Sequence, residues 1–180
     1  CATPTASAPR CSALAYSLVK VDRAGRTTPV NDQVLDYEDL HVSPDGPRVA
    51  MTIEEPGPGG TAAHVWLGNL LRGTLTRLTF EGYSRDPVWA PDGESVVYGS
   101  KRGESEFGLY LQRVDGRTPA ERVWASPTPI WRDPQSFSPD GRTVVFTTKG
   151  TETSDDIWTL SLDGERAARP WLATPATEWA

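Results

Sequence analysis

The chain has 180 residues, of which 37% are hydrophobic and 23% charged, and its formal net charge is −6. This length can bury a hydrophobic core. The acidic balance, without a basic stripe of interleaved aromatics, excludes nucleic acid as an expected partner. The sequence contains no run of about 18 or more apolar residues, so we expect no membrane span.

The first residues differ in composition from the rest of the chain. Residues 1–13 are rich in Pro, Ala, Ser and Thr and contain both cysteines, Cys1 and Cys11. This composition predicts a flexible or poorly matched lead-in. The sequence leaves open whether the two cysteines form a disulfide. Together with two distant histidines, His41 and His64, they are too few for a structural zinc site, so we expect neither a metal nor a cofactor.

A four-residue motif recurs along the chain and predicts a repeat protein. Ser-Pro-Asp-Gly at 43–46 returns as Ala-Pro-Asp-Gly at 90–93 and as Ser-Pro-Asp-Gly at 138–141. The prolines Pro44, Pro91 and Pro139 therefore lie 47 and 48 residues apart. This period lies in the range of propeller blades, roughly 40–50 residues, and exceeds that of helical-hairpin repeats.

A second landmark keeps step with the first. Trp66, Tyr110 and Trp158 follow the three prolines by 22, 19 and 19 residues, each inside a short apolar run. The runs alternate with the period of two that is expected of strands, and no helical stripe is visible. Each unit is thus interpreted as four short strands, and the three aromatic side chains are expected to pack between blades. The expected strands are 16–21 and 27–30, then 40–42, 48–53, 64–69 and 75–80, then 87–89, 95–99, 108–114 and 121–124, then 135–137, 143–148, 156–162 and 169–172.

These strands divide the chain into repeat units. We expect a lead-in at 1–13, a partial blade at 14–35, blades at 36–82, 83–129 and 130–174, and the start of a further blade at 175–180. The Pro-Asp-Gly motif closes the tight turn after the innermost strand of each unit. Proline presets φ, aspartate accepts from nearby amides, and glycine takes the positive φ. The motif aspartates are therefore turn residues first, not catalytic or metal-binding ones.

The repeat resembles a known family of blades. The stretch 65–100, in which Arg-Gly-Thr-Leu-Thr-Arg-Leu-Thr at 72–79 leads into Asp-Pro-Val-Trp-Ala-Pro-Asp-Gly at 86–93, resembles the WD40-like, or PD40, repeats of TolB-like β-propellers. Similar blades occur in TolB, in propellers of bacterial membrane-anchored serine/threonine kinases and in prolyl-oligopeptidase-type peptidases. The resemblance covers nearly everything after Leu14.

The resemblance implies an all-β fold, a propeller of TolB-like blades. We expect about three full four-stranded blades plus a partial N-terminal blade, that is, an incomplete ring or a fragment. It also implies a location in the bacterial periplasm or at the extracytoplasmic face, with any targeting segment upstream of residue 1.

The sequence contains no complete catalytic motif. The stretch 82–86, Gly-Tyr-Ser-Arg-Asp, lacks the last glycine of a Gly-x-Ser-x-Gly nucleophile elbow and its strand-to-helix context. His41 and His64 are interpreted as packing or surface residues. We therefore predict no enzymatic activity.

The candidate site follows from the propeller resemblance. In propellers, the connections from an outer strand to the next inner strand gather at one mouth of the central channel, and here they are rich in aromatic and charged residues that could contact a peptide or a small polar ligand. The alternative is that Arg85 with Asp86, and Arg132 with Asp133, only brace adjacent loops. The predicted binding residues are Tyr37, Glu38, Asp39, Tyr83, Arg85, Asp86, Trp131, Arg132, Asp133 and Glu178.

Three functional hypotheses follow. The first is a non-enzymatic binding module for a protein or small ligand, as in the sensor part of an envelope kinase. The second is the gating propeller of a prolyl-oligopeptidase-type hydrolase whose catalytic domain lies elsewhere. The third is a partial propeller whose copies associate as a homo-oligomer that closes the ring.

Overall fold

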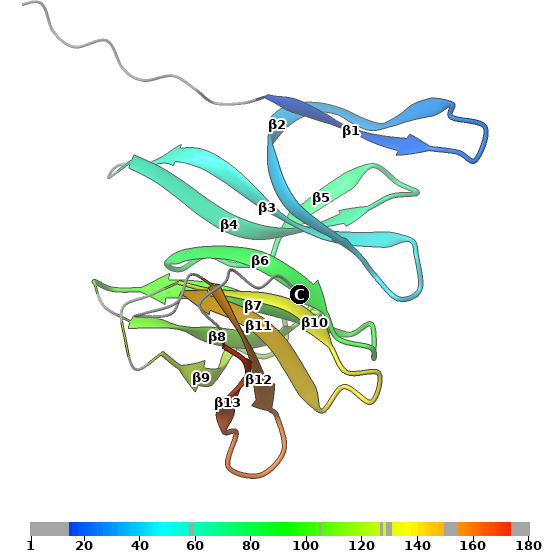
Figure 1. The fold of residues 1–180 in the computed structure, drawn as a ribbon. Helices are drawn as coiled ribbons and strands as arrows, with labels where there is room; N and C mark the ends of the chain where they lie inside the picture. Colours follow the sequence, from blue (N-terminus) through cyan, green and yellow to red (C-terminus); the bar gives the residue numbers. More distant parts are fainter. Residues whose placement is uncertain are drawn as a thin grey trace, which may run out of the picture.

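A computed structural model describes residues 15–57, 60–104, 106–126, 128, 131–149 and 155–173. These residues form β-strands and turns without a helix (Figure 1). Cys1, Cys11 and Glu178 lie outside them. The strands are β1 (Tyr16–Val21), β2 (Thr27–Val42), β3 (Arg48–Gly57), β4 (Gly60–Asn69), β5 (Thr74–Arg77), β6 (Tyr83–Trp89), β7 (Ser95–Arg102), β8 (Glu106–Arg113), β9 (Glu121–Ala125), β10 (Arg132–Phe137), β11 (Thr143–Lys149), β12 (Asp155–Ser161) and β13 (Ala168–Leu172).

The strands pair in chain order into three antiparallel sheets. The first sheet has the order β1-β2-β3-β4-β5, the second β6-β7-β8-β9 and the third β10-β11-β12-β13. In Figure 1 the strands β3, β4 and β5 lie above the second and third sheets, which overlap in this view, and the hairpin of β1 and β2 forms a further layer above them. No helix in the described ranges is long and apolar enough to cross a bilayer.

The core consists of three apolar clusters, one at each junction between layers. Trp66, Tyr110 and Trp158, predicted to pack between blades, each lie in or against one of these clusters. The first cluster holds Leu18, Tyr37, Val49, Met51 and Ile53. The second holds Ala50, Val65, Leu78, Trp89, Val96, Tyr98 and Tyr110. The third holds Val88, Val97, Leu109, Val123, Val144, Phe146 and Leu160.

The Pro-Asp-Gly turns are confirmed. Gly46, Gly93 and Gly141 have φ of +87°, +65° and +72°, and each amide donates to the carbonyl three residues earlier. In the second turn, Asp92 Oδ1 accepts from the amides of Glu94 and Ser95. The three turns lie on the same side of the molecule, on the right in Figure 1.

The innermost strands are longer than the sequence predicts. β2 runs without a break from Thr27 to Val42, pairing with β1 through 27–35 and with β3 through 36–42. β6 begins at Tyr83 and β10 at Arg132, where the sequence predicts loops up to Pro87 and Gln135. The prediction was wrong because each strand stays paired across a β-bulge instead of ending there.

Neighbouring sheets approach closely at Gly99 in β7. A Cβ atom on Gly99 would lie 2.5 Å from the carbonyl oxygen of Arg132 and 3.4 Å from Cζ2 of Trp131, both at the start of the third sheet. Only glycine allows this approach without a shift of the backbone.

We predict that Gly99→Ala lowers the free energy of unfolding by about 2 kcal/mol, because the third sheet must move away. Urea unfolding measures the loss. Gly116→Ala is the control, because a Cβ atom at Gly116 would meet open space. Only the positive φ of this residue should lower the free energy of unfolding, by about 1 kcal/mol. Equal losses in the two variants would contradict the close approach.

Candidate functional site

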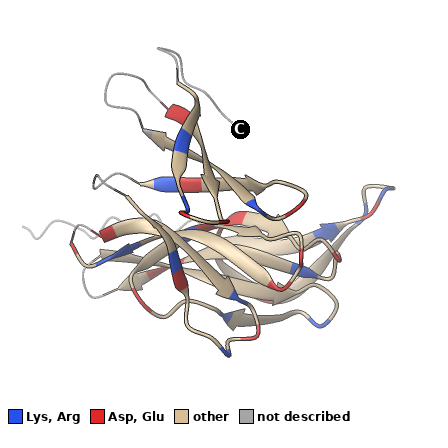
Figure 2. Cartoon of the chain, turned by 90° about the horizontal axis from the view of Figure 1, so that it is seen from below, with Lys and Arg blue, Asp and Glu red and all other residues tan. Residues whose placement is uncertain are grey.

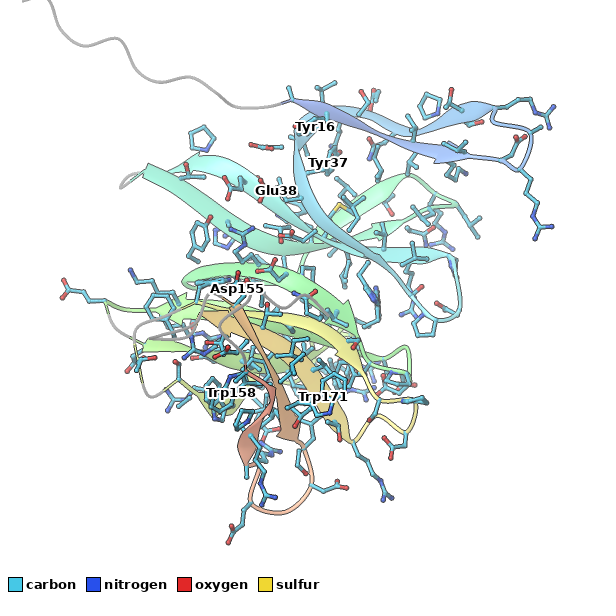
Figure 3. All side chains as sticks on the ribbon, in the orientation of Figure 1. Tyr16, Tyr37, Glu38, Asp155, Trp158 and Trp171 are labelled. Atoms are coloured by element: carbon cyan, nitrogen blue, oxygen red, sulfur yellow. The ribbon has the colours of Figure 1, made fainter. Side chains whose placement is uncertain are left out.

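The predicted site residues that the structure describes lie mostly within strands. Tyr37, Glu38 and Asp39 are in β2, whereas Tyr83, Arg85 and Asp86 begin β6. Arg132 and Asp133 begin β10, and Trp131 immediately precedes it. Most residues predicted in connecting loops therefore lie within the bulged inner strands β2, β6 and β10. Figure 3 labels Tyr37 and Glu38 on β2 and Asp155 at the start of β12.

Strand register shows which of these residues are equivalent. Glu38 pairs with Thr52, Arg85 with Gly99 and Asp133 with Thr147, and each pairing partner lies six residues after the glycine of its turn. Asp133 therefore takes the place of Arg85, although the Asp-Pro sequence had matched it to Asp86. The cause is a difference in spacing, because Asp133 precedes Pro139 by six residues whereas Asp86 precedes Pro91 by five.

Arg85 lies among carboxylates from two neighbouring strands. Its Nη2 atom is 3.5 Å from Glu38 Oε2 and 3.6 Å from Asp39 Oδ2, and its Nε atom is 3.1 Å from Asp86 Oδ2. Burial lowers the pKa of Arg85, but Asp86 and Asp39 outweigh this effect and hold the pKa above its ordinary value. The guanidinium thus joins the first and second sheets as a permanent charge.

Asp86 is held by both neighbouring sheets. Its amide donates to Thr52 Oγ1 at 3.2 Å, and its Oδ2 atom accepts from Trp131 Nε1 at 3.1 Å. Its φ of +56° is the left-handed conformation, as is the +50° of Asp39 at the corresponding bulge. Aspartate is among the few residues that adopt this conformation readily. The bulge turns the Asp86 side chain toward the third sheet.

Burial and neighbouring charges shift the pKa values of the carboxylates in this region. Burial raises the pKa of Asp86 to about 8, and repulsion from Asp133 and Asp39 adds to it, although Arg85 opposes the rise. Burial also raises the pKa of Asp133, whereas its interaction with Asp86 lowers it. We infer that the pair holds one proton and that it sits on Asp86. Burial and Glu54 raise the pKa of Glu38 in the same way.

Aromatic rings line the edge of the charged group. Tyr83 and Trp131 meet edge-on, with centroids 5.6 Å apart, and Trp131 meets Phe107 in the same manner at 5.8 Å. The Tyr83 hydroxyl donates to Glu54 Oε1 at 2.6 Å. Burial, reinforced by this bond, raises the pKa of Tyr83 to about 12. We name Glu38, Asp39, Tyr83, Arg85, Asp86, Trp131 and Asp133 the inner-strand cluster.

Two predicted site residues do not join this cluster. Arg132 is 7% exposed, donates to the Trp131 carbonyl and to Thr128 Oγ1, and lies over the Trp124 ring. Among the described residues no ion pair joins Arg132 to Asp133, whereas Arg85 Nε lies 3.1 Å from Asp86 Oδ2. Tyr37 packs in the first apolar cluster.

Other contributors were missed by the sequence analysis. Glu54 and Thr52 come from β3, and Phe107 comes from β8. Glu54 lies one residue beyond the strand end predicted at 53, so no signal marked it. We assign no metal site to the cluster, because the described residues hold no group of three or more His, Cys, Asp or Glu that could bind a metal ion. The excess of carboxylates suits hydrogen-bond donors and cations.

Charge elsewhere on the described surface is dispersed. Figure 2 shows acidic and basic residues interspersed along strands and turns. The inner-strand cluster differs in that its carboxylates surround a single guanidinium.

Comparison with known proteins identifies the fold. No protein-family model and no curated protein matches the sequence. Among solved structures, TolB from Acinetobacter baumannii has a TM-score of 0.67 at 17% identity, covering 84% of this chain and 36% of that one. The putative TolB from Agrobacterium tumefaciens has a TM-score of 0.63 at 20% identity, with 92% and 66% covered.

A peptidase shares the same architecture. A structure from a study of two prolyl endopeptidases has a TM-score of 0.66 at 14% identity, covering 93% of this chain and 28% of that one. The chain thus spans less than two thirds of each of these proteins. At such identities the likeness shows the fold alone, and it confirms the TolB-like β-propeller that the repeats predicted.

The proton of Asp86 makes stability depend on pH. Between the ordinary carboxyl pKa, near 4, and about 8, the folded chain holds a proton that the unfolded chain has lost. The free energy of unfolding that this group contributes therefore falls as pH rises through that window.

We predict that Asp86→Asn raises the free energy of unfolding at pH 8 by about 1–2 kcal/mol and changes it little at pH 4. Denaturant unfolding at both pH values measures this. Asp163→Asn, in an exposed turn, should show no such difference. A variant that is equally destabilised at both pH values would mean that Asp86 is ionised and stabilises the fold through Arg85.

Proposed function

We propose that this chain is a non-enzymatic binding module that recognises a protein or small ligand through the inner-strand cluster. The observation that carries the proposal is the group of Glu38, Asp39 and Asp86 around the single guanidinium of Arg85, with Asp133 beside Asp86. Carboxylates in excess of their counter-ions accept hydrogen bonds and attract cations. We therefore expect the ligand to present an ammonium, guanidinium or other donor group.

The way in which the cluster is held supports binding by a rigid surface. Arg85 and Asp86 contact β2 and β3 on one side and Trp131 on the other. The residues are therefore fixed before a ligand arrives, which reduces the ordering cost of binding. On this proposal the module belongs to a bacterial envelope protein, such as a membrane-anchored serine/threonine kinase, in the periplasm or at the extracytoplasmic face. Its support is the repeat resemblance.

A second candidate is the gating propeller of a prolyl-oligopeptidase-type hydrolase. The fold match to a prolyl endopeptidase over 93% of this chain favours it. On this candidate the catalytic domain lies elsewhere in the parent protein, and the isolated chain is inert. A neighbouring sequence with Gly-x-Ser-x-Gly followed by Asp and His would support it, whereas a neighbouring kinase domain would support the binding module.

A third candidate is closure of the ring by copies of the chain. Val19, Val21 and Val34 of the first hairpin are 43%, 62% and 56% exposed, and Trp171 on β13 is 69% exposed. Apolar side chains at both ends of the stack are suited to association. Light scattering at several concentrations tests this candidate, which requires a discrete oligomer.

The main proposal predicts the chemistry of selected ligands. Peptides selected on the immobilised chain from a random display library should be enriched in Lys and Arg. Replacement of Glu38 by Gln together with Asp133 by Asn should weaken their binding at least about tenfold, because a charge-assisted bond contributes roughly 1.5–3 kcal/mol. Titration calorimetry measures the change.

The matched control is Glu165→Gln, an exposed carboxylate in the β12–β13 turn, which should leave binding unchanged. Selected peptides that bind the double variant as well as the original chain would overturn the proposed site. Hydrolysis of ester or peptide substrates by the purified chain, blocked by a serine-directed inhibitor, would overturn its non-enzymatic nature.

A further inference from the structure

A pocket opens between the Pro-Asp-Gly turns of the second and third sheets. Its volume is about 410 Å³, within the range of roughly 300–1,000 Å³ for ligand pockets. It lies just beyond Trp89, so it is at the opposite end of β6 from the inner-strand cluster. Its lining includes Asp92, Ser95, Leu111, Phe137, Gly141 and Leu162.

One repeat earlier, an arginine of the chain occupies the corresponding junction. The Cζ atom of Arg48 lies 4.7 Å from the centroid of the Trp89 ring. Its Nη2 atom donates to Asp45 Oδ2 at 2.9 Å and to the Gly93 carbonyl at 2.7 Å. An aromatic face, a carboxylate and a glycine carbonyl thus hold this guanidinium between two sheets. Trp89 is only 2% exposed.

The pocket keeps all three of these groups. Asp92 and Gly141 occupy the same motif positions as Asp45 and Gly93, and Phe137 precedes its proline by two residues, as Trp89 does. The residue equivalent to Arg48, two positions after the turn glycine, is Ser95. The described lining of the pocket includes no arginine, so the second junction has the elements of a guanidinium site without its guanidinium.

The side walls of the two junctions correspond as well. Leu67 and Val114 pack against the apolar cluster that contains Trp89. Leu111 and Leu162 are their counterparts in strand register, and both line the pocket. The Asp92 carboxylate accepts from Ser95 Oγ at 3.2 Å through Oδ2, and this oxygen can accept a second bond.

We propose that this pocket binds the guanidinium of an arginine side chain that a partner protein presents, in the place that Arg48 fills one repeat earlier. Guanidinium suits it better than ammonium, because it is planar, stacks on aromatic rings and donates to two acceptors at once. A protein source fits the exposed turn edge at Pro91 and Pro139, which a side chain can reach from outside. The net charge of −6 also favours a basic partner.

The test uses the full chain and arginine probes. In a nuclear magnetic resonance titration, Nα-acetyl-arginine amide should shift the amide signals of Ser95, Phe137 and Gly141. Nα-acetyl-lysine amide should bind at least about fivefold more weakly, because it lacks the planar face. Equal affinity for the two amides, or shifts at other residues alone, would overturn the proposal.

Two reciprocal variants sharpen the test. Ser95→Arg supplies the missing guanidinium from within the chain and should abolish the shifts caused by arginine amide. Arg48→Ser should open an equivalent pocket beside Trp89, add a second binding site and shift the Gly93 amide. Phe137→Ala should weaken binding about threefold, as expected for loss of a cation–π contact. Undiminished binding in Ser95→Arg would overturn the proposal, even if Arg48→Ser fails to fold.

The source of the arginine is tested separately. A pentapeptide with arginine between glycine pairs should bind at least as tightly as arginine amide, because a protein partner presents the side chain from a flanking backbone. Substantially weaker binding of the peptide would indicate a pocket for a free small molecule and would overturn the assignment to a protein partner.

Discussion

Face-to-face stacking of the sheets is the constraint on which the rest of the structure depends. Strands β3 and β7 have neighbouring layers on both faces, so β3 contributes Met51 and Ile53 to one apolar cluster and Ala50 to the next. A large apolar side chain such as Met51 or Ile53, when fully buried, contributes about 1.5–3 kcal/mol. Apolar residues therefore occur consecutively in this strand, and no sheet can complete its core alone.

Stacking also explains why the inner strands can carry strained and charged residues. A positive φ at Asp39 and Asp86, and carboxylates close enough to raise one another's pKa, are each unfavourable by themselves. They persist because the sheets on either side fix the backbone through contacts such as the Asp86 amide with Thr52. Arg85 offsets part of the repulsion, and the proton on Asp86 offsets a further part.

The sequence predicted the features that local chemistry determines. The Pro-Asp-Gly turns, the paired strands and the packing aromatics follow from turn residues, alternation and period, and all were found. It failed where pairing across the sheet decides the outcome. The Asp-Pro pair of β10 looks like that of β6, yet the extra residue puts Asp133 opposite Thr147 and sends Arg132 into the junction beside Trp124. The extra residue is visible in the sequence, but which residue then lies opposite Thr147 is decided by pairing with the partner strand.

The repeats share a backbone and differ in the side chains placed on it, and both candidate sites arise from such differences. Register aligns Glu38 with Arg85 and Asp133, and motif position aligns Arg48 with Ser95 and Thr143. In the first set, the change from glutamate to arginine to aspartate along the repeats places one guanidinium among several carboxylates. In the second set, an arginine that closes one junction is replaced by serine, which leaves the next junction open. A stacked repeat tolerates these changes because the buried apolar residues at each junction still hold neighbouring sheets together, so binding surfaces can diverge while the fold is maintained.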